Sequence, residues 1–170
     1  LPKAIADPED VTARYYLLYA SLIAGVSFDN GLLHFTHALE HPLSAVKPEL
    51  SHGLGLAMIL PAVVKAIYPA SGEVLASIFE PIAPELTGDA DEAVKAAEAV
   101  ENWLFSIGVK SKLEDEGFAE ADIDKLVNLA KTTPSLDGLL SIAPVEATSD
   151  VIAEIYRTSL KPLAKSLVNA

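Results

Sequence analysis

All four histidines of this 170-residue chain lie between positions 34 and 52, in the stretch HFTHALEHPLSAVKPELSHG. Imidazole nitrogens are common ligands for divalent metals. On a helix that turns 100° per residue, His34, His37 and His41 fall within about 60° of one another and form one stripe. His52 stands at the expected start of the next helix, where a short return loop can bring it to the same place. The cluster therefore predicts a metal site.

The five residues HALEH inside this stretch also match the H-x-x-E-H pattern of inverted zinc peptidases, in which two histidines bind zinc and the glutamate is a general base. Such a site needs a third ligand from a later helix, and the segment ADEAVKAAEAVEN offers Glu92, Glu98 and Glu101. The match makes no use of His52 or of the glycines after it. A peptidase is therefore one alternative. A stand-alone helical binding or structural domain, whose histidines have no catalytic task, is another.

Composition excludes several other kinds of function. The chain carries 12 Lys and Arg against 24 Asp and Glu, a formal charge of -12, and has no basic stripe to neutralise phosphates, so we expect no nucleic-acid partner. Its longest uncharged runs, residues 15–28 and 50–64, are shorter than the roughly 20 apolar residues that cross a bilayer, so we expect no membrane span. The absence of cysteine excludes disulfides and thiol catalysis. With no visible signal peptide, these features favour a cytoplasmic protein.

Apolar residues recur at i, i+3 and i+4 along most of the chain, with almost no alternation of period two, which predicts an all-α fold. We expect one compact multi-helix bundle over residues 1–170. The histidines should lie on the second and third of its helices. The expected limits of the first three helices come from caps and prolines: a first helix capped by Asp7, with Pro8 in its first turn, to about Ser27; a second carrying GLLHFTHALEH and ended or kinked by Pro42; and a third capped by Ser51 and kinked by Pro61.

The rest of the chain is predicted as further helices with turns between them. We expect a short helix over residues 71–79, an amphipathic helix over 89–108 that ends at Gly108, a turn over 111–117 closed by Gly117, a helix over 119–133 before Pro134, and a last helix capped by Thr148 or Ser149.

The segment GLLHFTHALEHPLSAVKPELSHGLGLAMILPAV resembles the histidine-rich signature of the iron-containing, or group III, alcohol dehydrogenases. Members of that family show G-L-x-H and H-x-x-x-H-x-L-[GS]-A, then a loop, then H-G-x-x-x-A-x-x-L-P. Here HALEHPLSA and HGLGLAMILPAV supply those blocks in the same order. The segments ARYYLLYASLIAGVSFDNG, IGVKSKLEDEGFAEADIDKLVNLA and SIAPVEATSDVIAEIY resemble other parts of the family. The resemblance thus covers almost the whole chain.

The resemblance implies a protein of two domains, in which a Rossmann-like nucleotide-binding half precedes an all-helical metal-binding half. Residues 1–170 then form a single helical domain, an incomplete C-terminal half without the nucleotide-binding domain. In the family a divalent metal, Fe²⁺ or often Zn²⁺, is held by one Asp and three His. The Asp and the first His come from an upstream D-x-x-x-H pair, which is not found before Ala24, because Asp7 is followed by Val11 and Asp10 by Arg14.

Carried onto this chain, the motif makes His37 and His52 metal ligands. The same motif makes His41 the catalytic histidine that faces nicotinamide and substrate. The HPLSA block anchors this register, although GLLH alone would align His34 with the ligand and the KPELS loop is one residue longer than the commonest family spacing. His34 is therefore either a neighbour of the site or an alternative ligand.

Two glycines follow His52 and have two possible explanations. Gly53 and Gly55 open the third helix beside the expected ligand. One explanation is close approach of the backbone to cofactor or substrate, for which we single out Gly53. The other is tight packing against a neighbouring helix.

The implied function is metal-dependent, NAD(P)-linked interconversion of a small alcohol and its aldehyde or ketone. Its implied partner is the nucleotide-binding domain, and exposed apolar surface in the absence of that domain favours homo-oligomers. For residues 1–170 alone we expect little or no bound metal and no dehydrogenase activity. Two of the four metal ligands, and the glycine-rich motif that binds dinucleotide phosphates, are not in the sequence.

Overall fold

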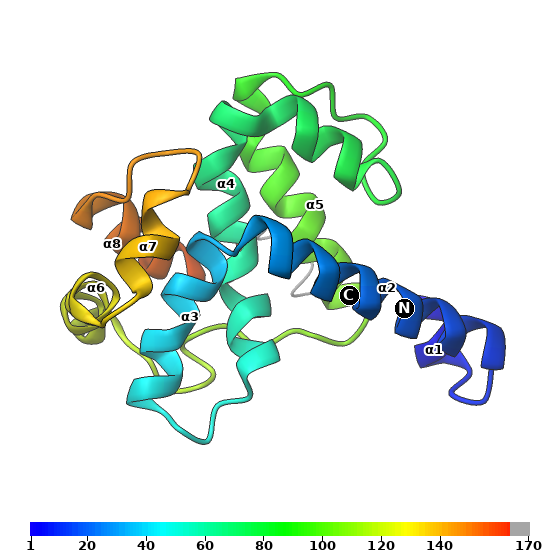
Figure 1. Cartoon of the computed structure of the whole chain (residues 1–170), viewed down its shortest axis with the longest axis horizontal. Coiled ribbons are helices and arrows are strands. Elements are labelled where there is room, and N and C mark those ends of the chain that lie inside the picture. Colours follow the sequence, from blue (N-terminus) through cyan, green and yellow to red (C-terminus); the bar gives the residue numbers. More distant parts are fainter. Residues whose placement is uncertain (164–170) are drawn as a thin grey trace. The chain divides into compact units, whose positions relative to one another are not determined.

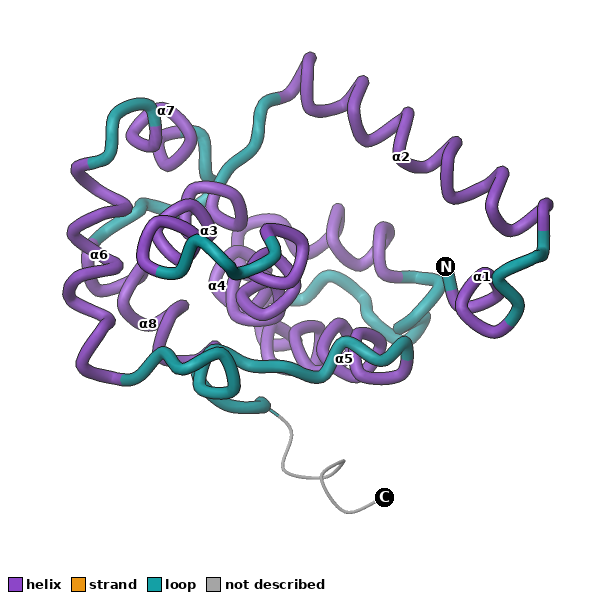
Figure 2. The backbone as a smooth tube through the Cα atoms, turned by 90° about the horizontal axis from the view of Figure 1, so that it is seen from below, coloured by secondary structure: helices purple, strands orange, loops and turns teal. Residues whose placement is uncertain are grey.

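The computed structural model of the chain describes residues 1–163. Every regular element in this range is a helix, as Figure 2 shows, which confirms the all-α prediction. The α-helices are α1 (Pro2–Ala6), α2 (Val11–Gly31), α3 (Phe35–Val46), α4 (His52–Phe79), α5 (Ala93–Ser106), α6 (Ile123–Thr132), α7 (Leu136–Ser141) and α8 (Ser149–Ser159). Short 3₁₀ turns, η1 (Ala90–Glu92) and η2 (Glu120–Asp122), precede α5 and α6.

The chain divides into two compact units, residues 1–33 and a second unit that begins at His34. The first unit contains α1 and α2. Asp10, and not Asp7 as expected, caps α2: its carboxylate accepts a hydrogen bond of 3.0 Å from the amide of Ala13, three residues on, which is the spacing of a helix cap. The helix also continues to Gly31, past the expected end near Ser27. The expectation of a single domain stays a prediction.

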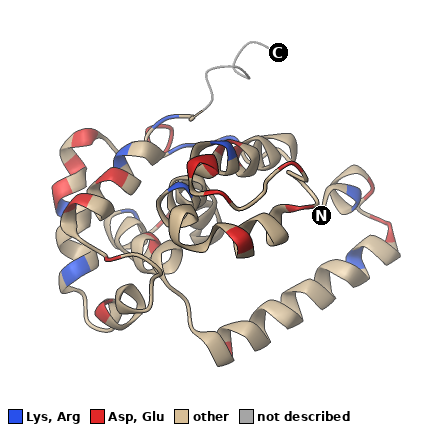
Figure 3. Ribbon diagram, turned by 90° about the horizontal axis from the view of Figure 1, so that it is seen from above, with Lys and Arg blue, Asp and Glu red and all other residues tan. Residues whose placement is uncertain are grey.

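Helix α2 buries none of its residues. Arg14 and Asp29 are its only charged residues, so the helix is almost uniformly tan in Figure 3. Its exposed large apolar side chains are Val11, Tyr15, Tyr16, Leu18, Tyr19, Leu22, Ile23, Val26 and Phe28. Taken by itself, this helix therefore presents a largely apolar surface.

The second unit is built around α4, which contacts α3, α5 and α8 (Figure 1). Met58, Ile59 and Val63 of α4 are buried in the core that α3 and α8 share with it. By length and composition alone α4 could cross a bilayer. The uncharged runs of the sequence are too short to predict such a span. Half of the most apolar stretch of α4 is buried within the fold, as is typical of a core helix.

Prolines inside α3 and α4 break these helices less than expected. Pro42 lies inside α3, which continues to Val46, so the helix does not end there. In α4 the backbone departs from helical angles at Ser71 (φ -138°, ψ 23°), two residues after Pro69 and not at Pro61. The segment expected as a separate helix over residues 71–79 is therefore the end of α4 beyond this break.

The later caps follow the sequence closely. Gly108 has a φ of 91° and follows the end of α5, and Thr148 accepts a hydrogen bond of 3.2 Å from the amide of Val151 at the start of α8. Gly117, with a φ of 78°, closes the turn after residue 111. Helix α7 was not predicted, since its six residues LDGLLS are too few for a periodic pattern and include a glycine.

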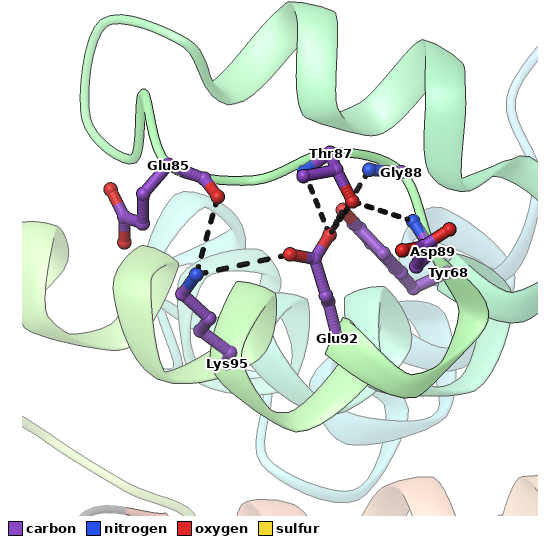
Figure 4. A network of polar contacts seen from close by, with 7 residues as sticks. All are labelled: Tyr68, Glu85, Thr87, Gly88, Asp89, Glu92 and Lys95. Atoms are coloured by element: carbon purple, nitrogen blue, oxygen red, sulfur yellow. Dashed lines mark hydrogen bonds and ion pairs between the residues drawn. The ribbon is translucent and has the colours of Figure 1, made fainter.

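The loop after α4 is held by one carboxylate, that of Glu92 (Figure 4). Its Oε2 accepts hydrogen bonds from the amides of Thr87 and Gly88, at 2.8 and 3.0 Å, and from the Thr87 and Tyr68 hydroxyls. The Gly88 backbone also lies close to α4: a Cβ at Gly72 would be 2.1 Å from the Gly88 carbonyl oxygen. Donation from the Thr87 amide, first among these contacts, lowers the pKa of Glu92 below its ordinary 4.5.

We predict that Glu92→Gln lowers the melting temperature at pH 7. Because the pKa of Glu92 is depressed in the folded chain, its stabilising effect is present above about pH 4.5 and is lost as pH falls through the folded pKa. The difference in melting temperature between the two chains should therefore shrink below about pH 4.5. Circular dichroism melts across pH 3 to 7 measure it, with Glu98→Gln in the following helix α5 as the control. A difference independent of pH would contradict the prediction.

Candidate metal and substrate site

The structure brings three of the four histidines together. His37 and His41 lie one turn apart on α3, and His52 is the first residue of α4. The ring centroid of His52 is 5.5 Å from that of His37 and 5.8 Å from that of His41. The short loop between α3 and α4 thus returns His52 to the other two, as the sequence suggested.

His34 does not share a helical stripe with the other histidines. It precedes α3 as its N-cap, with non-helical angles (φ -124°, ψ -134°), so the expectation of three histidines on one helix is wrong at this residue. Its half-buried ring lies edge-on to Phe35, and burial lowers its pKa. Its buried Nδ1 has no hydrogen-bond partner among the described residues.

A buried carboxylate contacts one ring of this cluster. Glu40 of α3 is fully buried, and its Oε2 is hydrogen-bonded to Nδ1 of His52. Its other oxygen, Oε1, accepts a hydrogen bond of 2.5 Å from the hydroxyl of Ser44, one turn on. Sequence reasoning considered this glutamate only as the base of a peptidase. Its position between two histidines of the cluster, with the polar Ser44 one turn on, was the available signal for a role beside those histidines.

The space for that carboxylate is provided by Gly55. A Cβ at Gly55 would lie 2.7 Å from Oε1 and 2.8 Å from Cγ of Glu40, which is closer than van der Waals contact allows. At Gly53 a Cβ would meet nothing within 4 Å. Of the two explanations given for these glycines, tight packing therefore applies to Gly55. That Gly53 lets a cofactor approach stays a prediction.

The environment of His37 favours its neutral form. Partial burial is the main cause that lowers its pKa, and the neighbouring His52 and His41 add to the effect. A histidine binds a metal as neutral imidazole, so a lowered pKa keeps His37 able to bind near neutral pH.

The loop that carries His52 back to α3 is itself anchored. The ammonium group of Lys47 donates to the backbone carbonyl of Glu116 and lies 5.3 Å from the centroid of the Phe118 ring. These contacts tie the start of the loop to the segment around Gly117. The extra residue in this loop therefore does not prevent His52 from reaching the other histidines.

The donor set fits part of a metal site. His37 and His52 offer two imidazoles, whereas a four-coordinate site needs two more donors. Within residues 1–163, no group of three or more His, Asp or Glu side chains is placed to hold a metal ion.

The peptidase alternative finds no support in the geometry of its glutamates. Glu40 is fully buried, so it cannot serve a substrate as a general base. Glu101 pairs with the buried Lys112 at 2.7 Å, and Glu92 holds the loop after α4, so neither supplies a third ligand.

The family to which the chain belongs follows from its similarity to known proteins. Residues 1–160 match the C-terminal part of the Fe-containing alcohol dehydrogenase family. The chain belongs to this family. This confirms the resemblance that the histidine-rich segment suggested.

Named relatives agree with this assignment. The chain is 67% identical over 159 residues to the long-chain primary alcohol dehydrogenase AdhA of Thermoanaerobacter ethanolicus, covering 94% of this chain and 40% of AdhA. It is 33% identical to the NAD-dependent methanol dehydrogenase of Bacillus methanolicus, covering 94% and 41%. A crystal structure of 1,3-propanediol oxidoreductase matches with a TM-score of 0.81 and 31% identity, over 93% of this chain and 41% of that one. The chain thus spans about two fifths of the length of these relatives.

We predict that Gly55→Ala destabilises the chain while Gly53→Ala does not. The added methyl at Gly55 overlaps the buried Glu40 carboxylate, and overpacking of this kind costs about 1–3 kcal/mol. The same methyl at Gly53 meets open space in a helix, where alanine is the better helix former. Urea unfolding of both variants measures the difference, and equal free energies of unfolding would contradict the packing at Gly55.

Proposed function

We propose that this chain forms the helical metal- and substrate-binding part of a metal-dependent, NAD(P)-linked alcohol dehydrogenase. The observation that carries the proposal is the return of His52 to the two histidines of α3: its ring centroid lies 5.5 Å from that of His37 and 5.8 Å from that of His41. Membership of the Fe-containing alcohol dehydrogenase family gives this cluster its chemistry. Two of the relatives described above are named as a primary alcohol dehydrogenase and a methanol dehydrogenase.

In this proposal His37 and His52 hold a divalent cation, Fe²⁺ or Zn²⁺. When bound, such an ion supplies Lewis-acid stabilisation of negative charge on the substrate oxygen. The chain's own residues position the two imidazoles: α3 supplies one, the anchored loop returns the other, and the lowered pKa of His37 keeps its ring neutral. The remaining donors come from outside these helices.

His41 has the exposure that a catalytic group needs. Its side chain is exposed, one turn from His37, and its ring faces that of His52 at a centroid distance of 5.8 Å. An imidazole can take up or release a proton near neutral pH, so His41 is placed to move the alcohol proton or to orient the nicotinamide. Gly53 follows His52 directly, and the open space where its Cβ would stand lets the cofactor come close to the backbone.

The dinucleotide itself needs a second domain. The relatives are about two and a half times as long as the part that this chain matches, which leaves room for a nucleotide-binding half. We propose that such a half covers α2, whose apolar side chains are exposed. Residues 1–170 alone should then hold little metal and turn over no alcohol.

Metal analysis distinguishes His34 from His37 as the ligand. In the enzyme that joins this chain to its nucleotide-binding half, His37→Ala and His52→Ala should each lower the zinc or iron retained after dialysis and abolish alcohol-dependent NAD(P) reduction. His34→Ala should retain the metal, because His34 lies outside the group of three rings. Elemental analysis per protein chain measures this. Loss of metal with His34→Ala and its retention with His37→Ala would contradict the assignment.

The isolated chain should self-associate through α2. Large exposed apolar surfaces mark sites of protein–protein interaction or aggregation, and in the isolated chain a second copy is the available partner. We expect Leu18→Lys combined with Leu22→Lys, one turn apart and both exposed, to shift the chain from oligomer to monomer in light scattering after size exclusion. Val74→Lys, an exposed apolar residue of α4, is the matched control. A chain that is monomeric before substitution would contradict the prediction.

A further inference from the structure

We infer that Glu40 is a positioning residue. It accepts a hydrogen bond from Nδ1 of His52 and so orients the ring with Nε2 available to a metal. The inference rests on the proposed metal function and concerns a residue that the family motif quoted above leaves unspecified. Glu40 contacts His52 directly, and it would act on the metal only through that ring.

A hydrogen bond joins the His52 ring to the Glu40 carboxylate. A carboxylate can only accept, so Nδ1 of His52 donates to Oε2 of Glu40 whether the ring is neutral or protonated. In the neutral ring this leaves the lone pair on Nε2. Metal-binding histidines commonly donate their other ring nitrogen to a carboxylate or carbonyl in this way, which fixes both tautomer and ring orientation.

The Glu40 carboxylate is itself held in place by its surroundings. Glu40 is fully buried, Ser44 holds its second oxygen, and the absence of a side chain at Gly55 makes its space. The backbone beneath it is fixed by Tyr156 of α8, whose hydroxyl donates to the Leu39 carbonyl at 2.7 Å. A group held from so many sides transmits its position to the half-exposed His52 ring.

Burial of the Glu40 carboxylate costs free energy. A buried carboxylate loses its hydration, and an apolar residue of similar volume at such a place is often as stable or more stable. Burial, and to a smaller extent the charge of Glu40, raise the pKa of Tyr156 well above its ordinary value, so the carboxylate also acts on a residue of α8. Stability alone therefore does not account for a glutamate here, whereas orientation of His52 does.

The test separates orientation from metal binding: the NMR uses the 170-residue chain, and the zinc measurement uses the enzyme that joins this chain to its nucleotide-binding half. Nitrogen-15 NMR of the imidazoles shows which nitrogen of His52 carries its proton, and calorimetric titration with Zn²⁺ alone measures affinity. We expect the proton on Nδ1 in the parent chain and its exchange between both nitrogens in Glu40→Leu. Zinc binding should weaken about ten- to a hundredfold in Glu40→Leu. Glu40→Gln, which keeps an acceptor, should weaken it less, and the exposed Glu49→Gln should leave it unchanged.

Two results would overturn the inference. One is a proton on Nε2 of His52 in the parent chain, and the other is unchanged zinc affinity in folded Glu40→Leu and Glu40→Gln. Circular dichroism establishes folding, and Glu40→Gln keeps the test decisive where the leucine variant does not fold. Failure of the metal function looks different: zinc affinity would then be insensitive to His37→Ala and His52→Ala, while the NMR result still shows whether Glu40 holds the His52 proton.

Discussion

The burial of the Glu40 carboxylate is the constraint on which the geometry of the histidine cluster depends. A carboxylate removed from water must be hydrogen-bonded, and here His52 and Ser44 meet that need. Satisfying it brings the start of α4 against the middle of α3, and Gly55 lets the two helices approach closely enough. The same contact that solves a solvation problem thereby places an imidazole beside His37.

The rest of the second unit supports this pair of helices. α4 packs on α3, α5 and α8, so its first residue is held by a long buried element and not by a mobile loop. Lys47 fixes the connecting loop from outside, and Tyr156 fixes α3 from α8. Rigid support of this kind matters because a metal ligand must be held near its working geometry before the ion arrives.

Much of this arrangement was predictable, because it depends on local signals. The periodicity of apolar residues predicts the all-α fold, and Gly108 and Thr148 predict an end of α5 and the start of α8. The clustering of histidines, together with the family motif, predicts that His37, His41 and His52 lie close together. Three details were not predictable. Asp7 and Asp10 both fit a cap, and only the backbone selects Asp10. Pro42 stays inside α3 because tertiary packing outweighs its missing hydrogen bond. The burial of Glu40 depends on Gly55, fifteen residues away, which no helical pattern connects to it.

The five residues HALEH show why a motif needs its surroundings before it indicates a chemistry. In a peptidase the glutamate of such a motif must face water and substrate to act as a base. Here Glu40 points into the protein, while His41 next to it is exposed and His37 lies between these extremes. The glutamate therefore acts on a histidine and not on a substrate. That arrangement depends on the residue opposite the carboxylate: a side chain larger than a hydrogen at Gly55 would displace Glu40 and with it the hydrogen bond to His52.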